Sequence, residues 1–166
     1  TPVMTRFVDK KRLMVWLMAA AGVLSCAMFL VPRDAVWLLF LLNTLVGLAL
    51  GPKSPLAFSM YADCADYTEW KTGRRATAMT FSAATFSQKL GGALAAALIG
   101  WMLAAMGYVA NQAQSDASQL GIALLLTVIP GVVAFFAAAV MRAYPLDAAT
   151  MVEVQDALDA RRAERA

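Results

Sequence analysis

Lys89 is the residue whose position makes the strongest chemical demand on this sequence. It lies fourteen residues into the apolar segment 76–106, roughly 20 Å along a helix from the start of that segment. An ammonium at that depth in a membrane needs water, a carboxylate or a ligand, because its stem does not reach the surface. Thr85 shares its helical face and Gln88 lies beside it. We therefore predict a hydrogen-bonding stripe in a wet, ligand-binding cavity.

The structural alternative for Lys89 is a pair with an acid that locks two helices together. The sequence disfavours this alternative, because the predicted spans offer no carboxylate as a partner.

Three carboxylates follow one another at three-residue spacing, namely Asp63, Asp66 and Glu69. On a helix they would share one face, and at a membrane surface such carboxylates could hold a metal for lipid-headgroup chemistry. Lys71, Arg74 and Arg75 follow directly in the same stretch, which we predict to be a loop, and can pair with them. We favour a charge cluster that gates or staples the cytoplasmic ends of helices over the metal site of an interfacial lipid-modifying enzyme.

The remaining residues give no sign of catalysis. The sequence has no histidine, which is the commonest catalytic base and metal ligand. It contains no Ser/His/Asp or Cys/His set and no glycine-rich phosphate loop. Cys26 and Cys64 are predicted to lie too far apart to form a disulfide. We expect no enzymatic activity, no cofactor and no metal site.

The composition predicts that these residues are carried by membrane-spanning helices. Hydrophobic residues make up 61% of the chain and charged residues 15%, whereas globular domains average about 25% charged. About 20 apolar residues cross the hydrocarbon core as a helix. Four segments meet this requirement, residues 13–32, 36–60, 76–106 and 120–141. The predicted fold class is therefore an all-α integral membrane protein with four transmembrane helices.

The distribution of cations orients the four spans. The amino-terminal block, the connection between the second and third spans, and the tail hold four, three and four Lys or Arg residues. The two opposite connections hold Arg33 and no cation, respectively. The positive-inside rule then places both termini in the cytoplasm. We divide the chain into a transmembrane region, 1–144, and a cytoplasmic tail, 145–166.

The tail is predicted to form an amphipathic helix. Asp147 can cap its start, and apolar residues then recur at helical spacing. These residues are Met151, Val154 and Leu158.

Proline and glycine predict bends in two spans. Gly51-Pro52 and Pro55 weaken the second span, and Pro130-Gly131 is expected to bend the fourth. Lys53 lies beside the first bend and can extend its stem toward the cytoplasmic surface, and its role stays open.

The residues between Met60 and Gly92 carry a family resemblance. Ala62-Asp63, Asp66-Tyr67-Thr68-Glu69-Trp70-Lys71, Gly73 and Arg75 are followed by Lys89-Leu90-Gly91-Gly92. This resembles the pattern A-D-x-x-D-Y-G-E-[WY]-K-x-G-x-R, and then a helix with a buried lysine, of the glycoside–pentoside–hexuronide:cation symporters. These are the melibiose-permease group of the major facilitator superfamily. Thr68 replaces the usual glycine of the pattern.

The resemblance implies a role in sugar transport. It equates the four spans with helices nine to twelve of a twelve-helix carrier in the inner (cytoplasmic) membrane. It assigns sugar binding to Lys89, with Thr85 and Gln88 beside it, and places Ser54 near a sugar-contacting position. The implied activity is symport of a sugar or glycoside with Na⁺ or H⁺. The implied partners are the substrate, the coupling cation, the bilayer and the remaining helices of the carrier, with no nucleic acid.

The length of the chain bears on how it would act. The family binds its coupling cation mainly on the amino-terminal half, which this sequence lacks, and four helices cannot enclose a cavity between two six-helix bundles. We therefore expect a carrier fragment. The alternative is a stand-alone four-helix subunit or a small oligomeric transporter.

Overall fold

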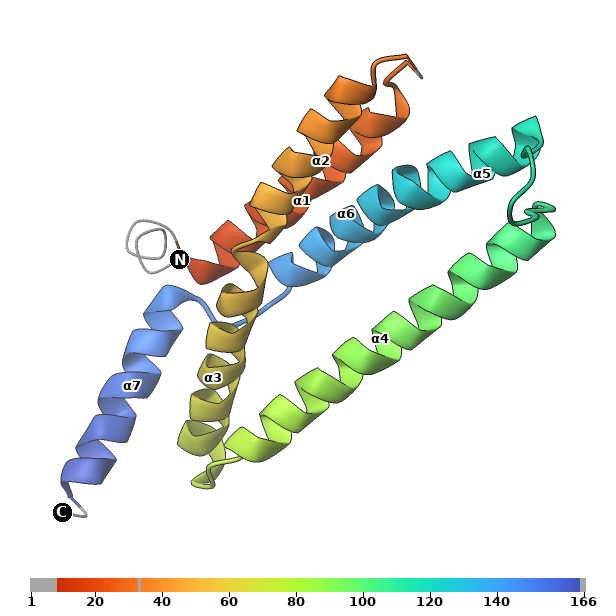
Figure 1. Cartoon of the computed structure of the whole chain (residues 1–166). Helices are drawn as coiled ribbons and strands as arrows, with labels where there is room; N and C mark the ends of the chain where they lie inside the picture. Colours follow the sequence, from red (N-terminus) through yellow and green to blue (C-terminus); the bar gives the residue numbers. More distant parts are fainter. Residues whose placement is uncertain (1–8, 33, 165–166) are drawn as a thin grey trace.

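The chain is built from α-helices in the computed structural model, which describes residues 9–32 and 34–164 (Figure 1). The helices are α1 (Lys10–Phe29), α2 (Val36–Leu50), α3 (Lys53–Thr72), α4 (Thr77–Ala105), α5 (Asp116–Leu126), α6 (Val128–Arg142) and α7 (Ala148–Ala163). Four helical units are long and apolar enough to cross a membrane: α1, α2 with α3, α4, and α5 with α6. The predicted all-α membrane fold with a further carboxy-terminal helix is confirmed.

The helices diverge from a tightly packed pair. α1 packs along both α6 and α2, whereas α3 and α4 meet near their connection and α4 then runs back at a distance from the rest (Figure 1). The start of α1 and the end of α6 lie beside the middle of α3, which continues past them to its connection with α4 (Figure 1). Helix α7 packs alongside α3. We call this part of the molecule, from the start of α1 and the end of α6 to the α3–α4 connection, the charged end.

Both broken spans owe their breaks to proline. The second span is interrupted between Leu50 and Lys53, as Gly51-Pro52 predicts. The fourth span, however, breaks at Thr127 (φ −124°, ψ −70°) and not at Pro130-Gly131. A proline ring clashes with the carbonyl four residues earlier, so Pro130 is accommodated only in the first turn of a helix. The break therefore falls three residues before the proline.

The segment expected to be a loop between the second and third spans is mostly helical. α3 continues to Thr72 and ends at Gly73, whose φ of +70° is a left-handed conformation that glycine adopts without strain. Asp63, Asp66, Glu69 and Lys71 thus lie on a helix, whereas Arg74 and Arg75 lie in the α3–α4 connection. The prediction failed because low hydrophobicity shows where a membrane ends, not where a helix ends. Thr68 is accommodated in right-handed helix, where its hydroxyl donates to the Cys64 carbonyl at 2.8 Å.

α1 and α6 approach each other closely enough for backbone contact. Gly22 and Gly131 are both buried, and a Cβ built on either would lie 3.1 Å from the carbonyl oxygen of the other. A Cβ on Gly131 would also meet the Cys26 sulfur at 2.5 Å. Small residues permit such backbone contact, which is how membrane helices gain van der Waals packing that lipid does not provide.

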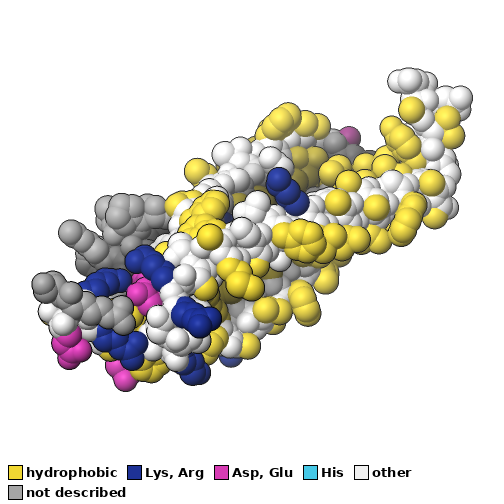
Figure 2. All heavy atoms as spheres, turned by 90° about the horizontal axis from the view of Figure 1, so that it is seen from below, with side chains coloured by type: hydrophobic (Ala, Val, Ile, Leu, Met, Phe, Trp, Pro, Cys, Tyr) yellow, Lys and Arg dark blue, Asp and Glu magenta, His cyan; other side chains and the backbone are white. Residues whose placement is uncertain are grey.

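The core is small and the apolar surface is large. A buried cluster joins α1, α3 and α6 through Leu13, Met14, Met18, Leu56, Met60 and Ala138. In contrast, neither α2 nor α4 has a buried residue, and large apolar side chains cover much of the visible face (Figure 2). Exposed apolar surface on this scale suits lipid or further helices and not water.

Replacing Gly131 with valine should destabilise the packing of α1 on α6. The added atoms meet backbone and the Cys26 sulfur, and overpacking of this kind costs typically ~1–3 kcal/mol. Gly47→Val is the matched control, because a Cβ on Gly47 meets nothing within 4 Å. Thermal unfolding in detergent should show a lower midpoint for Gly131→Val alone. Equal losses in the two variants would contradict the assigned contact.

Candidate functional site

The predicted polar stripe lies on α4. Thr85, Gln88 and Lys89 are all exposed and, at spacings of three and four residues, occupy one face of the helix. The Gln88 side-chain amide donates to the Tyr61 hydroxyl of α3 at 3.3 Å. This bond directs Gln88 toward α3, and Lys89, the next residue along α4, is exposed beside it.

Lys89 has no protein partner in the described part of the chain, where its ammonium makes neither an ion pair nor a hydrogen bond. The structural alternative required an acid that locks α4 to a neighbour. Among the described residues no acid does so, and the ammonium is left available for water or a ligand.

Three aromatic rings hold α3 against α4 at the level of the stripe. The centroids of Phe58 and Tyr61 on α3 lie 6.2 Å and 6.0 Å from that of Phe81 on α4, and 5.8 Å from each other. Aromatic pairs at such distances contribute about 0.5–1.5 kcal/mol beyond their buried area. No sequence pattern singled out these rings, although the spacing of Ser54, Phe58 and Tyr61 marks one face of a helix.

Ser54 shares that aromatic face of α3 but lies away from Lys89. It is exposed and precedes Tyr61 by seven residues, roughly 10 Å along the helix. Tyr61 bonds to Gln88, which is next to Lys89 in the chain. The structure therefore brings Thr85, Gln88 and Lys89 together and places Ser54 about two turns farther from the charged end. Lys53 is exposed at the first turn of α3.

The strongest ion pair at the charged end joins α1 to α3. The Lys10 ammonium donates to both oxygens of Asp63 at 2.7 and 2.9 Å, and the Asp63 side chain is 14% exposed. Sequence reasoning assigned Asp63 to pairing with the cations that follow it. Asp63 instead pairs with Lys10, which lies 53 residues earlier in the chain. A basic residue at the start of one span and an acid near the end of another is the signal that could have suggested the pair.

The other two carboxylates pair with Arg75, in the α3–α4 connection. Its guanidinium lies 3.8 Å from Asp66 and 3.7 Å from Glu69. Lys71, predicted to pair with these acids, instead donates to the Tyr67 hydroxyl at 3.1 Å. The cluster thus matches the predicted charge pairing at Arg75 and departs from it at Lys71 and at Arg74, which pairs with no acid among the described residues.

Helix α7 adds two contacts to this cluster. Gln155 donates to Asp66 at 3.4 Å, and Arg161 donates to the Trp70 carbonyl at 3.1 Å. Val154 and Leu158 are buried on the same helix, so the predicted amphipathic pattern does face the protein.

The three carboxylates are not arranged to share a metal ion. Each is engaged by a cationic or amide group, with Asp63 on Lys10 and the other two on Arg75. Among the residues that the structure describes, no three His, Cys, Asp or Glu side chains are grouped closely enough to hold one.

Tyr144 links the end of α6 to α3. Its hydroxyl lies 3.4 Å from the Cys64 sulfur and 3.5 Å from the Met60 carbonyl oxygen. Burial and the Cys64 contact raise the pKa of Tyr144 far above its usual range, so the hydroxyl stays protonated. It lines a cavity of about 120 Å³ together with Lys10 and Asp63.

Helix α7 is capped as predicted. The Asp147 carboxylate accepts from the Thr150 backbone N–H at 2.8 Å, and this hydrogen bond lowers the pKa of Asp147 below its usual 3.8.

Comparison with known proteins places these features in context. The sequence profile of the family described as MFS/sugar transport protein matches residues 1–148. The chain is 38% identical over 152 residues to an uncharacterized 29.9 kDa protein of Pseudescherichia vulneris, covering 91% of this chain and 56% of that protein. It is 37% identical over 130 residues to the inner membrane symporter YicJ of Escherichia coli, covering 78% of this chain and 28% of the symporter.

A third relative is the putative glycoside/cation symporter YagG of Escherichia coli, 32% identical over 123 residues, which are 74% of this chain and 27% of that protein. No solved structure gives a significant match. The chain thus spans a little over half the length of the first relative and little more than a quarter of the two symporters.

Asp63→Asn should loosen the contact between α1 and α3. The substitution removes a charged, doubly bonded acceptor from Lys10, which we expect to lower the free energy of unfolding by about 1–2 kcal/mol. Asp159→Asn is the control, because its pair with Arg162 is exposed and lies within one helix. Thermal unfolding should separate the two variants, and an unchanged midpoint in Asp63→Asn would contradict the pair.

The cap of α7 should depend on pH. Because the pKa of Asp147 is lowered on folding, its stabilising contribution is present above the ordinary pKa of 3.8 and is lost as the pH falls through the folded value. Amide hydrogen exchange at Thr150 should therefore lose protection below about pH 4 relative to Asp147→Asn, whose neutral amide caps at every pH. Parallel pH profiles for the two proteins would refute this cap.

Proposed function

Because this chain belongs to the MFS/sugar transport protein family, we propose that it works within a secondary active transporter that carries a sugar or glycoside with Na⁺ or H⁺. The relatives named as symporters support this assignment, and the four apolar spans make the chain a multi-pass membrane protein. We place it in the inner (cytoplasmic) membrane, with its charged end in the cytoplasm. The transport cycle is proposed for the whole protein to which these helices belong.

The observation that carries the proposal is the stripe of Thr85, Gln88 and Lys89. It lies on a membrane helix without buried residues, and its direction is set by the bond from Gln88 to Tyr61. Sugars are recognised by convergent hydrogen-bond donors beside apolar rings. Lys89 and Gln88 carry five N–H donors, of which four are left after the bond to Tyr61, and Phe58, Tyr61 and Phe81 supply the rings.

Lys89 also accounts for coupling in this scheme. An unpaired ammonium within the membrane attracts carboxylates that helices outside this chain would contribute. When Na⁺ or H⁺ binds those carboxylates, their attraction for Lys89 falls and its donors become free for sugar hydroxyls. The cation and the sugar then bind with positive coupling, which is reciprocal by thermodynamic necessity. Ser54 would contact the part of the substrate farther from the charged end.

The ion pairs at the charged end are suited to gating. The Arg75 side chain is 58% exposed and its two pairs are 3.7–3.8 Å long, so each is worth about 0–1 kcal/mol. Such pairs can break and reform as helix ends separate during alternating access. The Lys10–Asp63 pair is shorter and has two hydrogen bonds, and it keeps α1 and α3 together throughout the cycle.

Lys89→Ala should abolish accumulation of sugar against its gradient. The change removes the cation that links sugar binding to coupling-ion binding. Uptake of a radiolabelled glycoside would be measured in cells expressing the whole protein, with and without an imposed Na⁺ or H⁺ gradient.

Arg74→Gln is the matched control for that experiment. It removes one positive charge from an exposed side chain that pairs with no acid among the described residues. It should accumulate sugar normally. If Lys89→Ala reaches the same gradient-driven accumulation as Arg74→Gln at equal expression, Lys89 does not have the proposed role.

A further inference from the structure

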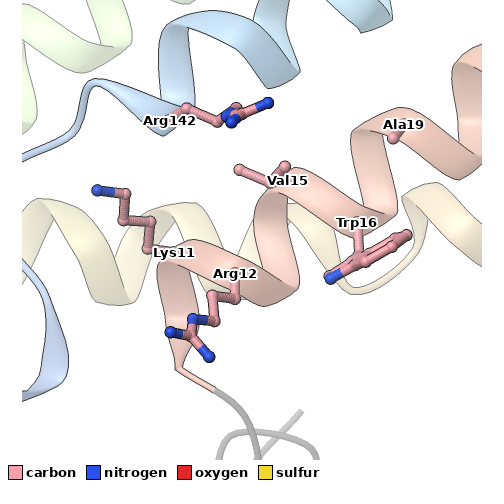
Figure 3. A pocket seen from close by; sticks show the side chains of 6 residues that line it. All are labelled: Lys11, Arg12, Val15, Trp16, Ala19 and Arg142. Carbon is pink, nitrogen blue, oxygen red and sulfur yellow. The ribbon is translucent and has the colours of Figure 1, made fainter.

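A groove between the first turns of α1 and the last turn of α6 takes no part in the proposed transport scheme (Figure 3). Its volume is about 550 Å³, within the ~300–1,000 Å³ usual for sites that bind small molecules. The lining residues are Lys11, Arg12, Val15, Trp16, Ala19 and Arg142. Three of these residues are cations at the charged end and the other three are apolar, so the groove has a cationic half and an apolar half.

The three cations line the groove from two helices, and no acid is among the lining residues (Figure 3). In the part of the chain that the structure describes, the side chains of Lys11, Arg12 and Arg142 make no ion pair and no hydrogen bond. Two acids lie near Lys11, and each caps a helix and does not line the groove. Asp9 accepts from the Lys11 backbone N–H at 3.1 Å, and Asp147 caps α7. Like charges held close together repel each other, and an anion bound between them removes that repulsion.

The apolar half of the groove determines which anion fits. The whole groove follows α1 from Lys11 to Ala19, roughly 12 Å, and its apolar half covers the last four residues of that length, from Val15 to Ala19, roughly 6 Å farther into the membrane. Trp16 is 71% exposed on this face, and tryptophan is enriched where a protein meets the membrane–water interface. A water-soluble anion would leave this apolar half empty, whereas an amphiphile would fill both halves.

We propose that the groove binds one anionic glycerophospholipid of the cytoplasmic leaflet. Its phosphate lies between Lys11, Arg12 and Arg142, and an acyl chain follows Val15 and Ala19 past the Trp16 ring. Basic pockets between transmembrane helices bind anionic headgroups by the same charge pairing. Because Arg142 belongs to α6 and the other two cations to α1, the bound lipid joins these helices at the charged end.

Quenching by brominated lipid tests this site directly. The whole protein is reconstituted in phosphatidylcholine containing a rising fraction of phosphatidylglycerol, with bromine on the acyl chains of one lipid or the other. The difference from Trp16→Phe isolates the Trp16 signal from that of every other tryptophan in the protein. We expect brominated phosphatidylglycerol to quench Trp16 at a lower mole fraction than brominated phosphatidylcholine.

Two charge-matched double variants locate the effect. R12Q/R142Q removes two cations from the groove, and K71Q/R74Q removes two from the charged end outside it. Each cation near an anionic lipid contributes roughly a factor of five to its binding. The mole fraction of phosphatidylglycerol that gives half-maximal quenching should therefore rise about 25-fold in R12Q/R142Q and stay unchanged in K71Q/R74Q.

Three outcomes would overturn the proposal. Equal quenching by the two brominated lipids would show an unselective lipid contact. Absence of quenching by both would show that other helices of the protein cover the groove. Equal shifts in R12Q/R142Q and K71Q/R74Q would show a general attraction of the charged end for anionic membranes, without a site.

Discussion

The backbone contact between Gly22 and Gly131 is the constraint on which the rest of the arrangement depends. In a bilayer, apolar side chains gain little by leaving lipid for one another, so helices associate where backbones can approach closely. α1 and α6 meet in this way, since a Cβ added to either glycine would lie 3.1 Å from the carbonyl oxygen of the other. Once they are joined, Met14 and Met18 of α1 face Leu56 and Met60 of α3, and the core cluster closes.

The remaining helices are held by interactions of a different kind. α3 is tied to α1 by the Lys10–Asp63 pair, and to α4 by three aromatic rings and one amide–hydroxyl bond. Helix α7 covers the same end of α3 through Val154 and Leu158. Polar contacts thus gather at one end of the molecule and glycine packing lies within the apolar region. The proposed lipid site lies between the two regions.

Sequence patterns predicted the elements better than they predicted the contacts. Composition and span length identified four membrane helices, and Gly51-Pro52 located the break between α2 and α3. The break in the fourth span was predicted at Pro130-Gly131 but lies at Thr127, because a proline ring clashes with the carbonyl four residues before it. Helical periodicity placed Thr85 and Lys89 on one face.

No pattern along the chain specified the partners across helices, because these depend on how helices pack. The Lys10–Asp63 pair spans 53 residues, and the Gln88–Tyr61 bond spans 27.

The composition of α4, which carries Lys89, also has a consequence for insertion into the membrane. Its seven Leu, Ile and Phe residues favour insertion by about 2–4 kcal/mol in total, and one central lysine opposes it by about 2.5–3.5 kcal/mol. The two contributions nearly cancel, so the free energy of inserting α4 into lipid would be close to zero. α3 is synthesised earlier and offers the aromatic surface that retains α4.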